Sequence, residues 1–262
     1  MNEKPTIVIK VGGASAGDQA TFSHFIADAA ALRERAAIVL VHGGGAQVTA
    51  LGRRLGIEPV FANGVRMTGE AEMDVVDMVL CGLMNKQIVR AMVARGIPAV
   101  GVSGSDGALF IGRPITDASG NPSRTGSLDH CDPRLLQTLI GAGYLPVVAS
   151  TFTDGSGGGL NLNADDAALA IAGALAVESL LFLSDTPGIL DKAGTLIPAL
   201  STSAVEAAIA DETITGGMVV KSRACATALN NGAKNIIIGR YGEPGDLERL
   251  LFQAYGTRIH HD

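Results

Sequence analysis

A lysine inside an apolar strand pattern is the first residue of this chain that could do chemistry. Lys10 stands in the run Thr6–Val11, which is otherwise almost wholly apolar and is typical of a strand buried on both faces. Burying an unpaired ammonium group is costly, so Lys10 needs an internal carboxylate or a bound anion, unless its side chain extends out of the sheet to water. Gly12 and Gly13 follow at once. Because ligands of open parallel sheets bind at the carboxyl ends of strands, the pattern favours an anion beside Lys10.

Three consecutive glycines, Gly43–Gly45, follow a second apolar run and precede a helical pattern. The free N–H groups of such a loop can bind an anion, although a tight turn would also need small residues. Neither glycine loop matches GxxxxGK[ST] or GxGxxG, which excludes the standard Walker and Rossmann nucleotide sites. His42 has no second metal ligand at a useful spacing, so we expect it to be a hydrogen-bonded histidine at the strand end.

Four further side chains could bind or stabilise charge. Arg66 precedes a long helical pattern and could bind a carboxylate through two N–H groups, with a surface salt bridge as the alternative. Asn163 and Asp165 begin an alanine-rich helical pattern, where an N-cap and a first-turn charge are common structural uses. Lys221 follows a glycine pair, although most helical lysines are simply solvated.

Together these residues favour phosphoryl transfer. Two lysines, glycine-rich loops, an arginine and an aspartate suit a reaction that depends on positioning and on neutralising charge. The set includes no serine, cysteine or histidine nucleophile and no conspicuous base. A hydroxyl acceptor would usually want a base, whereas a carboxylate is already deprotonated near neutral pH. The pattern therefore favours a kinase that makes an acyl phosphate.

The elements that must position these residues alternate between strand and helix patterns. Strands are predicted near residues 6–11, 37–41, 99–102, 145–149, 179–184 and 234–238. Helices are predicted near residues 18–34, 45–55, 70–95, 132–142, 164–177, 202–210 and 217–231. This order predicts an α/β fold, a three-layer αβα sandwich around a mainly parallel open sheet. Turn residues within 111–128 predict a β-hairpin, and a similar excursion is expected at 57–67.

Composition limits the class of protein further. With 262 residues, 47% of them hydrophobic, the chain can bury a large core as one α/β domain or two lobes. A formal net charge of −6 gives no reason to expect nucleic acid or an anionic membrane as partner. Cys81, Cys131 and Cys225 lie far apart, which argues against a disulfide framework or a zinc site. No secretory signal is visible and the apolar run Ala167–Val177 is too short to span a membrane, so we expect a cytoplasmic protein.

Several segments carry a resemblance to a known family, at residues 9–13, 41–45, 63–68, 144–148, 161–165, 183–190, 217–221 and 256–259. In these segments the chain resembles the acetylglutamate kinases of the amino acid kinase family, over essentially its whole length. The lysine, triple-glycine and Asp-x-x-Gly-Ile/Leu motifs occur across that family. The pair Asn-Gly-x-Arg-x-Thr and Asn-x-Asn-Ala-Asp is more specific to the acetylglutamate kinases.

The resemblance implies a role for each matching residue. Lys10 and Lys221 would stabilise the transferring phosphoryl group, and Asp165 would hold the two ammonium groups in place. Gly13 and Gly44 would donate N–H groups to the phosphoryl oxygens. N-acetyl-L-glutamate would be bound by Gly44, Gly45, Arg66 and Asn161, with the arginine on its α-carboxylate. ATP would be bound by Asp185, Thr186, Pro187, Gly188, Ile189, Leu190, Thr213, Ile214, Thr215 and Gly217.

The resemblance also implies two lobes, with residues 1–177 binding acetylglutamate and forming a dimer and residues 178–262 binding ATP. Mg²⁺ would be carried by the ATP phosphates, because the sequence has no dedicated carboxylate cage for a metal. Arginine-inhibited members have an extra amino-terminal helix, whereas only Met1–Pro5 precede the first strand here. Residues 245–251 also depart from the His-containing pattern of those members. We therefore expect an arginine-insensitive homodimer in arginine biosynthesis.

Two alternatives stay open. Residues 81–86 and 103–110 also resemble kinases that phosphorylate a carrier-linked aminoadipate or glutamate in lysine or arginine biosynthesis. Those kinases bind a strongly acidic carrier protein, whereas this chain is itself acidic and has no conspicuous run of Lys and Arg. The other alternative is a non-catalytic sensor that binds nucleotide or amino acid without turnover. Such a sensor would be expected to lack a catalytic lysine or the aspartate, and all three residues are present.

Overall fold

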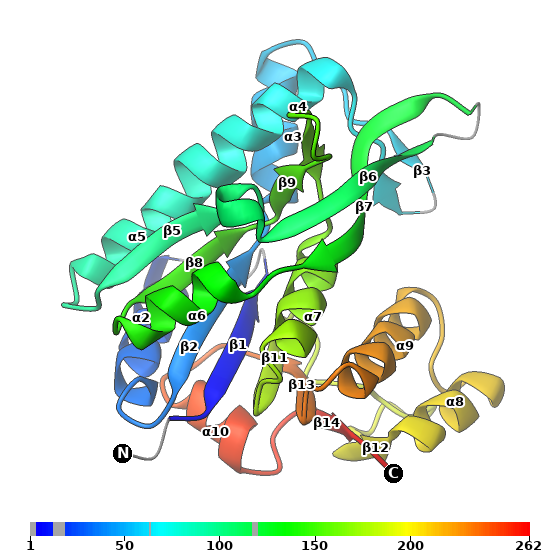
Figure 1. The fold of residues 1–262 in the computed structure, drawn as a ribbon. Coiled ribbons are helices and arrows are strands. Elements are labelled where there is room, and N and C mark those ends of the chain that lie inside the picture. The colour runs from blue at the N-terminus through cyan, green and yellow to red at the C-terminus, as the bar shows by residue number, and fades with distance from the viewer. Residues whose placement is uncertain (1–3, 13–18, 63, 117–119) are drawn as a thin grey trace. The chain divides into compact units, whose positions relative to one another are not determined.

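The computed structural model describes residues 4–12, 19–62, 64–116 and 120–262, and Figure 1 shows their helices and strands. The chain forms two compact units. The first unit consists of Met1–Leu40 together with Ala168–Asp262, and the second unit consists of Val41–Ala167. These boundaries divide the chain by how its residues pack. The predicted boundary after residue 177 divides it by which ligand each lobe binds, and it stays a prediction.

The first unit is organised around strands that are mostly parallel. Their order is β12 (Ala199–Ser201), β14 (Thr257–His260), β13 (Asn235–Arg240), β11 (Ser179–Ser184), β1 (Thr6–Val11) and β2 (Ala37–His42). β1 and β13 both pair in parallel with β11, and β13 and β14 are antiparallel. The apolar side chains of β1 and β11 are almost completely buried, as the unbroken apolar runs predict. The helices are α2 (Gln19–Leu32), α8 (Thr202–Ala210), α9 (Gly217–Asn230) and α10 (Asp246–Phe252).

The second unit combines a parallel strand pair with a small closed barrel. β5 (Ala99–Ser103) pairs in parallel with β8 (Leu145–Ala149). The barrel has the order β10 (Gly159–Asn161), β7 (Pro122–Cys131), β6 (Phe110–Thr116) and β9 (Thr151–Thr153), and β3 (Phe61–Ala62) and β4 (Val65–Arg66) form a separate hairpin. The helical segments are α3 (Gly45–Arg54), α4 (Glu70–Asp77), the π-helix η1 (Met78–Met84), α5 (Asn85–Val93), the 3₁₀ turn η2 (Asp106–Ala108) and α6 (Arg134–Gly141). α7 (Ala164–Ala174) begins in this unit and continues into the first.

The predicted α/β class with mainly parallel strands is confirmed, and each predicted strand, helix and hairpin has a counterpart within a few residues. Sequence analysis missed the short strands β9, β10, β12 and β14, because three or four residues are too few to show a periodicity. α10 was missed as well, because its seven residues make only about two helical turns. It also missed the π-helix inside the predicted helix at 70–95, since π-helical turns lack a sequence period of their own. No helix in the described ranges is long and apolar enough to cross a membrane.

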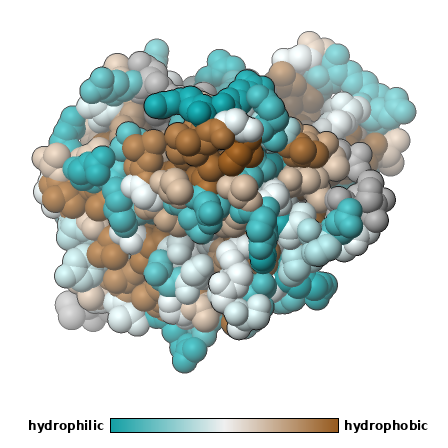
Figure 2. Space-filling view, turned by 90° about the horizontal axis from the view of Figure 1, so that it is seen from above, coloured by the Kyte–Doolittle hydropathy of each residue, from teal (hydrophilic) through white to brown (hydrophobic). Residues whose placement is uncertain are grey.

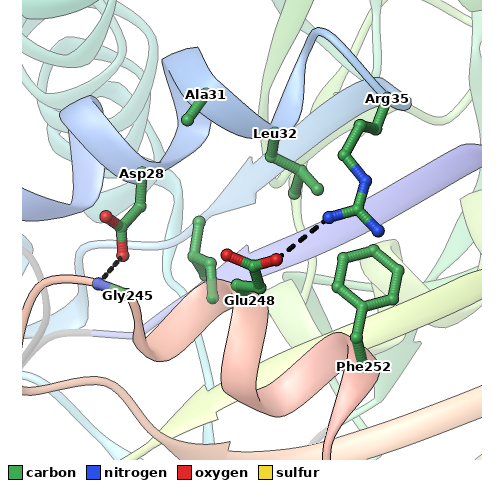
Figure 3. Close-up of a pocket in the computed structure, with 8 residues that line it drawn as sticks. Asp28, Ala31, Leu32, Arg35, Gly245, Glu248 and Phe252 are labelled. Carbon is green, nitrogen blue, oxygen red and sulfur yellow. Dashed lines mark hydrogen bonds and ion pairs between the residues drawn. The ribbon is translucent and has the colours of Figure 1, made fainter.

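A small recess between α2 and α10 of the first unit contains none of the predicted site residues (Figure 3). The cavity has a volume of about 160 Å³. The Asp28 carboxylate accepts a hydrogen bond from the Gly245 N–H at 2.7 Å, and Arg35 pairs with Glu248 at 3.0 Å. The Arg35 guanidinium also lies 4.2 Å from the centre of the Phe252 ring. These contacts join the two helices, so the recess is part of their packing.

Candidate active site

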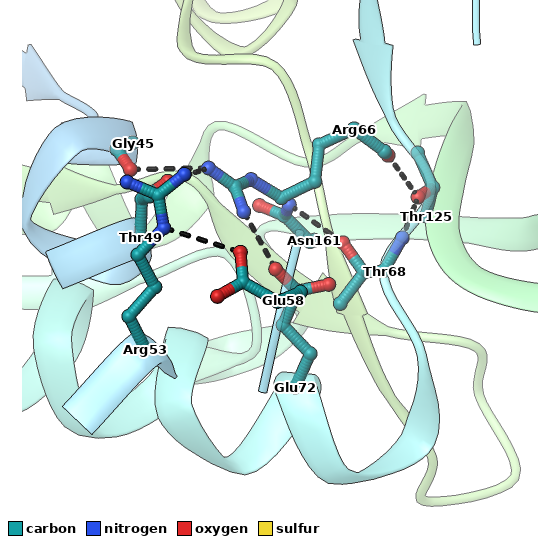
Figure 4. A network of polar contacts seen from close by, with 9 residues as sticks. All are labelled: Gly45, Thr49, Arg53, Glu58, Arg66, Thr68, Glu72, Thr125 and Asn161. Carbon is teal, nitrogen blue, oxygen red and sulfur yellow. Dashed lines mark hydrogen bonds and ion pairs between the residues drawn. The ribbon is translucent and has the colours of Figure 1, made fainter. Parts of the chain in front are cut away.

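The guanidinium group of Arg66, at the end of β4, is held from three directions in the second unit (Figure 4). Nη1 donates to Glu72 Oε1 at 2.6 Å, and Nη2 donates to Thr49 Oγ1 at 2.7 Å and to the Gly45 carbonyl oxygen at 3.1 Å. The side chains of Arg66 and Glu72 are only 11% and 6% exposed. The salt bridge that the sequence offered as an alternative is therefore present, with Glu72, but it is largely buried and does not lie on the surface. The guanidinium group lies in a fixed, largely buried position.

Arg66 keeps hydrogen-bonding capacity for a ligand in this position. A guanidinium group has five N–H donors, and the three contacts above use both on Nη2 and one on Nη1. Among the described residues, no acceptor faces Nε. An anion such as a carboxylate can therefore bind at the remaining donors, and the interaction would be charge-assisted.

Asn161 belongs to the same hydrogen-bonded network as Arg66. Asn161 Nδ2 donates to Thr68 Oγ1 at 3.0 Å, and the Thr68 N–H donates to Thr125 Oγ1 at 2.8 Å. Thr125 Oγ1 in turn donates to the Arg66 carbonyl oxygen. Asn161 and Thr125 face each other on β10 and β7, so the barrel holds the amide and the hairpin holds the guanidinium. The amide oxygen of Asn161 makes no described protein contact and can accept an N–H from a ligand.

Gly44 is packed so closely against the π-helix that a side chain would not fit. A Cβ atom on Gly44 would lie 2.8 Å from Leu80 Cδ2 and 3.2 Å from Met84 Cγ. Gly44 is the N-cap residue of α3, and no side chain caps this helix start. The first N–H groups of α3 have no partner within the helix, which makes this end suitable for an anion. Gly13, the other predicted N–H donor, lies outside the described residues.

Lys10 and Lys221 both lie next to Phe182 in the first unit. Lys10 on β1 is the register partner of Phe182 on β11. The Lys221 ammonium group lies 4.6 Å from the centre of the Phe182 ring. A Cβ atom on Gly12 would be only 3.6 Å from Lys10 Nζ, so this ammonium group lies over the strand-end glycine. Both lysines are half-buried, and both make further contacts, so neither is simply solvated.

Asp165 lies in the first turn of α7 in the second unit. The Asn163 side-chain oxygen accepts a hydrogen bond from the Asp165 N–H at 2.8 Å, so Asn163 has the structural role of a cap. Burial, and then the neighbouring Asp165 charge, raise the pKa of Asp166 above its ordinary value. The two lysines belong to the first unit, so the role of Asp165 in holding them stays a prediction.

The predicted nucleotide-binding segments are anchored mainly through their backbones. In the loop after β11, the Asp185 carbonyl oxygen accepts from Arg240 Nε at 2.8 Å. The Ile189 N–H donates to Thr257 Oγ1 at 2.7 Å. Gly188 has φ 153°, and a Cβ atom there would lie 2.6 Å from Thr257 Oγ1, so this turn requires glycine.

The second nucleotide-binding segment, Thr213–Thr215, precedes α9, which begins at Gly217. The Thr213 N–H donates to Asp211 Oδ1 at 2.9 Å, and the N–H of the buried Ile214 donates to the Ala208 carbonyl oxygen at 2.8 Å. Both contacts fix the backbone. The Thr213 side chain also hydrogen-bonds to the Asp211 carboxylate and helps to lower its pKa, whereas the exposed Thr215 side chain is available to a ligand.

Sequence reasoning missed several residues that build this site, namely Thr49, Thr68, Glu72, Thr125 and Phe182. Glu72 stands in the first turn of a predicted helix, where an acidic residue is usual for the helix dipole alone. Of these five residues, Thr68 alone had a sequence signal that could have found it, because it ends the Asn-Gly-x-Arg-x-Thr motif.

The described part of the chain contains potential metal ligands and three cysteines, of which two have shifted pKa values. No group of three or more His, Cys, Asp or Glu side chains within these residues could hold a metal ion. Burial raises the pKa of the Cys81 thiol and raises that of Cys131 to about 12, so neither forms a nucleophilic thiolate near neutral pH.

Residues 5–240 match the model of the amino acid kinase family, and the chain belongs to this family. It is 40% identical to the acetylglutamate kinase of Acidiphilium cryptum (strain JF-5), over 97% of this chain and 90% of that protein. It is 41% identical to the acetylglutamate kinase of Bradyrhizobium diazoefficiens, over 98% of this chain and 92% of that protein.

Solved structures support the fold. An N-acetylglutamate synthase from Neisseria gonorrhoeae, complexed with coenzyme A and N-acetyl-glutamate, superposes with a TM-score of 0.86 at 23% identity, covering 99% of this chain and 60% of that one. The carbamate kinase from Giardia lamblia bound to AMP-PNP superposes with a TM-score of 0.72 at 19% identity and covers all of both chains.

Proposed function

We propose that this chain transfers the γ-phosphoryl group of ATP to the side-chain carboxylate of N-acetyl-L-glutamate, giving N-acetyl-L-glutamyl 5-phosphate in cytoplasmic arginine biosynthesis. The observation that carries this proposal is the network that joins Arg66 to Asn161 in the second unit. It presents a cationic donor and an amide oxygen at fixed positions, and acetylglutamate has a carboxylate and an amide N–H to match them. Relatives at about 40% identity over nearly the whole chain are acetylglutamate kinases.

In this mechanism Arg66 binds the α-carboxylate and Asn161 Oδ1 accepts the N–H of the acetylated amine. The side-chain carboxylate is then the nucleophile, and it needs no base because it is ionised near neutral pH. Glu72 and Thr49 hold the guanidinium in place, so the acceptor is oriented before the phosphoryl group arrives. Gly45 contributes through its carbonyl contact to Arg66.

The phosphoryl group is stabilised by charge and by backbone N–H groups. Lys10 and Lys221 neutralise the charge on the transferring oxygens, while Gly13 and Gly44 donate N–H groups to them. Asp165 is assigned to holding the two ammonium groups. ATP is bound by the segments 185–190 and 213–217, and Mg²⁺ enters on its phosphates.

The lobe assignment and the assembly belong to the same proposal. Residues 1–177 would bind acetylglutamate and form a homodimer, and residues 178–262 would bind ATP. Met78, Leu83 and Val93 lie on the helical segments of residues 70–93 and are 57%, 46% and 54% exposed, which is apolar surface that a second copy could cover. Apolar surface is also visible among hydrophilic residues in the space-filling view of Figure 2. Sedimentation of the purified protein tests the dimer, and a monomer would contradict it.

The decisive experiment on the reaction traps the acyl phosphate with hydroxylamine. We expect hydroxamate to form only with ATP, Mg²⁺ and N-acetyl-L-glutamate together. L-glutamate is the matched control, because it has the same side-chain carboxylate and lacks the acetyl amide that Asn161 would bind. An absence of hydroxamate with acetylglutamate would overturn the proposed function, and equal turnover of L-glutamate would overturn the role of Asn161.

A further inference from the structure

The triple-glycine loop of the second unit is held by a buried chain of hydrogen bonds that reaches it from α5. His42 Nδ1 lies 3.0 Å from the Gly43 carbonyl oxygen, and His42 Nε2 lies 3.2 Å from Asn85 Nδ2. Lys86 Nζ donates to Asn85 Oδ1 at 3.0 Å. His42 and Asn85 are 2% and 1% exposed. The series Lys86, Asn85, His42 and Gly43 is therefore continuous, and its centre is shielded from water.

These contacts define the protonation of His42. The ammonium group of Lys86 can only donate, so Asn85 must present its oxygen to Lys86 and its nitrogen to His42. His42 Nε2 then accepts, and the ring proton lies on Nδ1, where it donates to the Gly43 carbonyl oxygen. Burial lowers the pKa of His42 below its ordinary value, and the charge of Lys86 lowers it further against the opposing effect of the Gly43 hydrogen bond. The imidazole is therefore neutral at pH 7, as this tautomer requires.

The bond to Gly43 determines where the next N–H points. The Gly43 carbonyl and the Gly44 N–H belong to one planar peptide unit, and in a trans peptide these two groups point in opposite directions. The described residues include no cis peptide bond. Glycines tolerate many backbone conformations, so a loop of three of them does not hold this plane by itself. Fixing the Gly43 oxygen fixes the Gly44 N–H.

The surrounding strands are shaped to admit the chain of hydrogen bonds. A Cβ atom on Gly101 of β5 would lie 1.8 Å from Asn85 Oδ1 and 2.6 Å from Lys86 Nζ. Lys86 Nζ also donates to the Gly101 carbonyl oxygen at 3.2 Å, and Asn85 Nδ2 donates to the Val147 carbonyl oxygen of β8 at 2.8 Å. The amide of Asn85 is thus held at its nitrogen by the backbone of β8 and at its oxygen by Lys86, which is itself anchored to the backbone of β5, and this fixes the group that faces His42.

We infer that His42, Asn85 and Lys86 form a positioning relay that directs the Gly44 N–H toward the transferring phosphoryl group. The inference rests on the proposed function, in which Gly44 is an N–H donor to that group. A donor that acts on charge developing in the transition state affects kcat more than it affects substrate binding. His42 and Asn85 are almost completely buried, so in this inference they act through the loop.

The test compares kcat and both KM values of the wild type with those of His42→Leu, His42→Asn and Lys86→Met, well below each variant's melting temperature. We expect His42→Leu to lose about 10- to 100-fold in kcat, since misplacing a catalytic donor has effects of this order, with both KM values within about threefold. His42→Asn keeps a donor close to the position of Nδ1 and should recover part of the loss. Lys86 is exposed, so the Lys86→Met variant should fold normally. We expect its kcat to be about threefold to tenfold lower than that of the wild type.

A matched control separates positioning from stability. Asp246 of α10 is 2% exposed and accepts hydrogen bonds from the Gly242 and Glu243 N–H groups, outside the proposed machinery. Asp246→Asn should lower the melting temperature and leave kcat unchanged. If His42→Leu behaves like this control, losing stability but keeping kcat, the relay is wrong.

A double-mutant cycle tests whether Lys86 acts through His42. In the His42→Leu background, Lys86→Met should have little further effect on kcat, whereas independent residues would show additive losses and overturn the relay.

Failure of the proposed function would give a different result. In that case the wild type itself makes no acyl phosphate from acetylglutamate. The ¹⁵N chemical shifts of His42 give a second readout, because a proton on Nε2 would overturn the relay whatever the activity.

Discussion

The two predicted ligand-binding regions are built in different ways. In the second unit, Arg66 and Asn161 are held mainly by other side chains, which bury a charged pair and a row of hydroxyl groups. In the first unit, the loop 185–190 is held through its backbone, and the side chains of Asp185 and Thr186 are exposed. A small acid must be recognised by a few fixed charges, whereas a nucleotide can be bound along a shaped backbone. Side-chain substitutions should therefore be far more damaging in the second unit, with the two lysines that we propose to be catalytic as the exception.

The largest effect is expected from Lys10→Arg in the first unit. Arginine keeps the charge, but its planar fork is wider than the ammonium group that lies over the strand-end glycine, so we expect its charge to be misplaced there. We expect kcat to fall by about 100-fold or more while both KM values change little. Steady-state kinetics check this result. A near-normal kcat would show that Lys10 does not stabilise the transition state. The first unit would then recognise its ligand mainly through backbone groups.

Arg66→Lys should have the next largest effect and should act on one substrate. The replacement loses the fork that joins Glu72, Thr49 and the ligand, and charged hydrogen bonds of this kind contribute about 1.5–3 kcal/mol each. We expect KM for acetylglutamate to rise by about 10- to 100-fold, with KM for ATP unchanged. Equal increases in both KM values would mean that Arg66 does not belong to the acetylglutamate site.

Glu72→Gln tests whether the buried side-chain network matters beyond Arg66 itself. The amide keeps the shape of the side chain and can still accept one hydrogen bond, but it leaves the buried guanidinium without its counter-charge. We expect KM for acetylglutamate to rise by about threefold to tenfold, together with a lower melting temperature. Unchanged values for both would show that Thr49 and the Gly45 carbonyl hold Arg66 without help.

Thr186→Ala should have the smallest effect and is the most direct test of backbone recognition. The Thr186 side chain is exposed and makes one described side-chain contact, to Ser184 Oγ at 3.3 Å. We expect KM for ATP to change by less than about threefold, because losing one exposed hydrogen bond has an effect of this order. A change above tenfold would show that this loop recognises ATP through side chains, and the contrast between the two units would disappear.

The sequence predicted the candidate site unevenly, and the missed residues share a physical reason. Lys10 and Arg66 could be selected because a charge beside a buried strand or a turn needs an explanation, whereas Asn161 was selected through the family resemblance. Glu72 and Asn85 could not, because both lie in a helical pattern where a polar residue is ordinary. The role of Asn85 depends on His42, which is 43 positions earlier in the chain, and the role of Glu72 depends on Arg66, which reaches it from the β3–β4 hairpin.

The sequence by itself determined the α/β class, the parallel core strands and the family, and it predicted an anion held by lysines and glycines. These features depend on local periodicity and on residue types, which a linear pattern records. Only the tertiary structure decided that Arg66 is buried and paired, that His42 Nδ1 faces the Gly43 carbonyl oxygen, and that Gly44 must lack a side chain. Each of these depends on atoms that approach within about 3 Å from distant parts of the chain, and no local pattern specifies which distant atoms will meet.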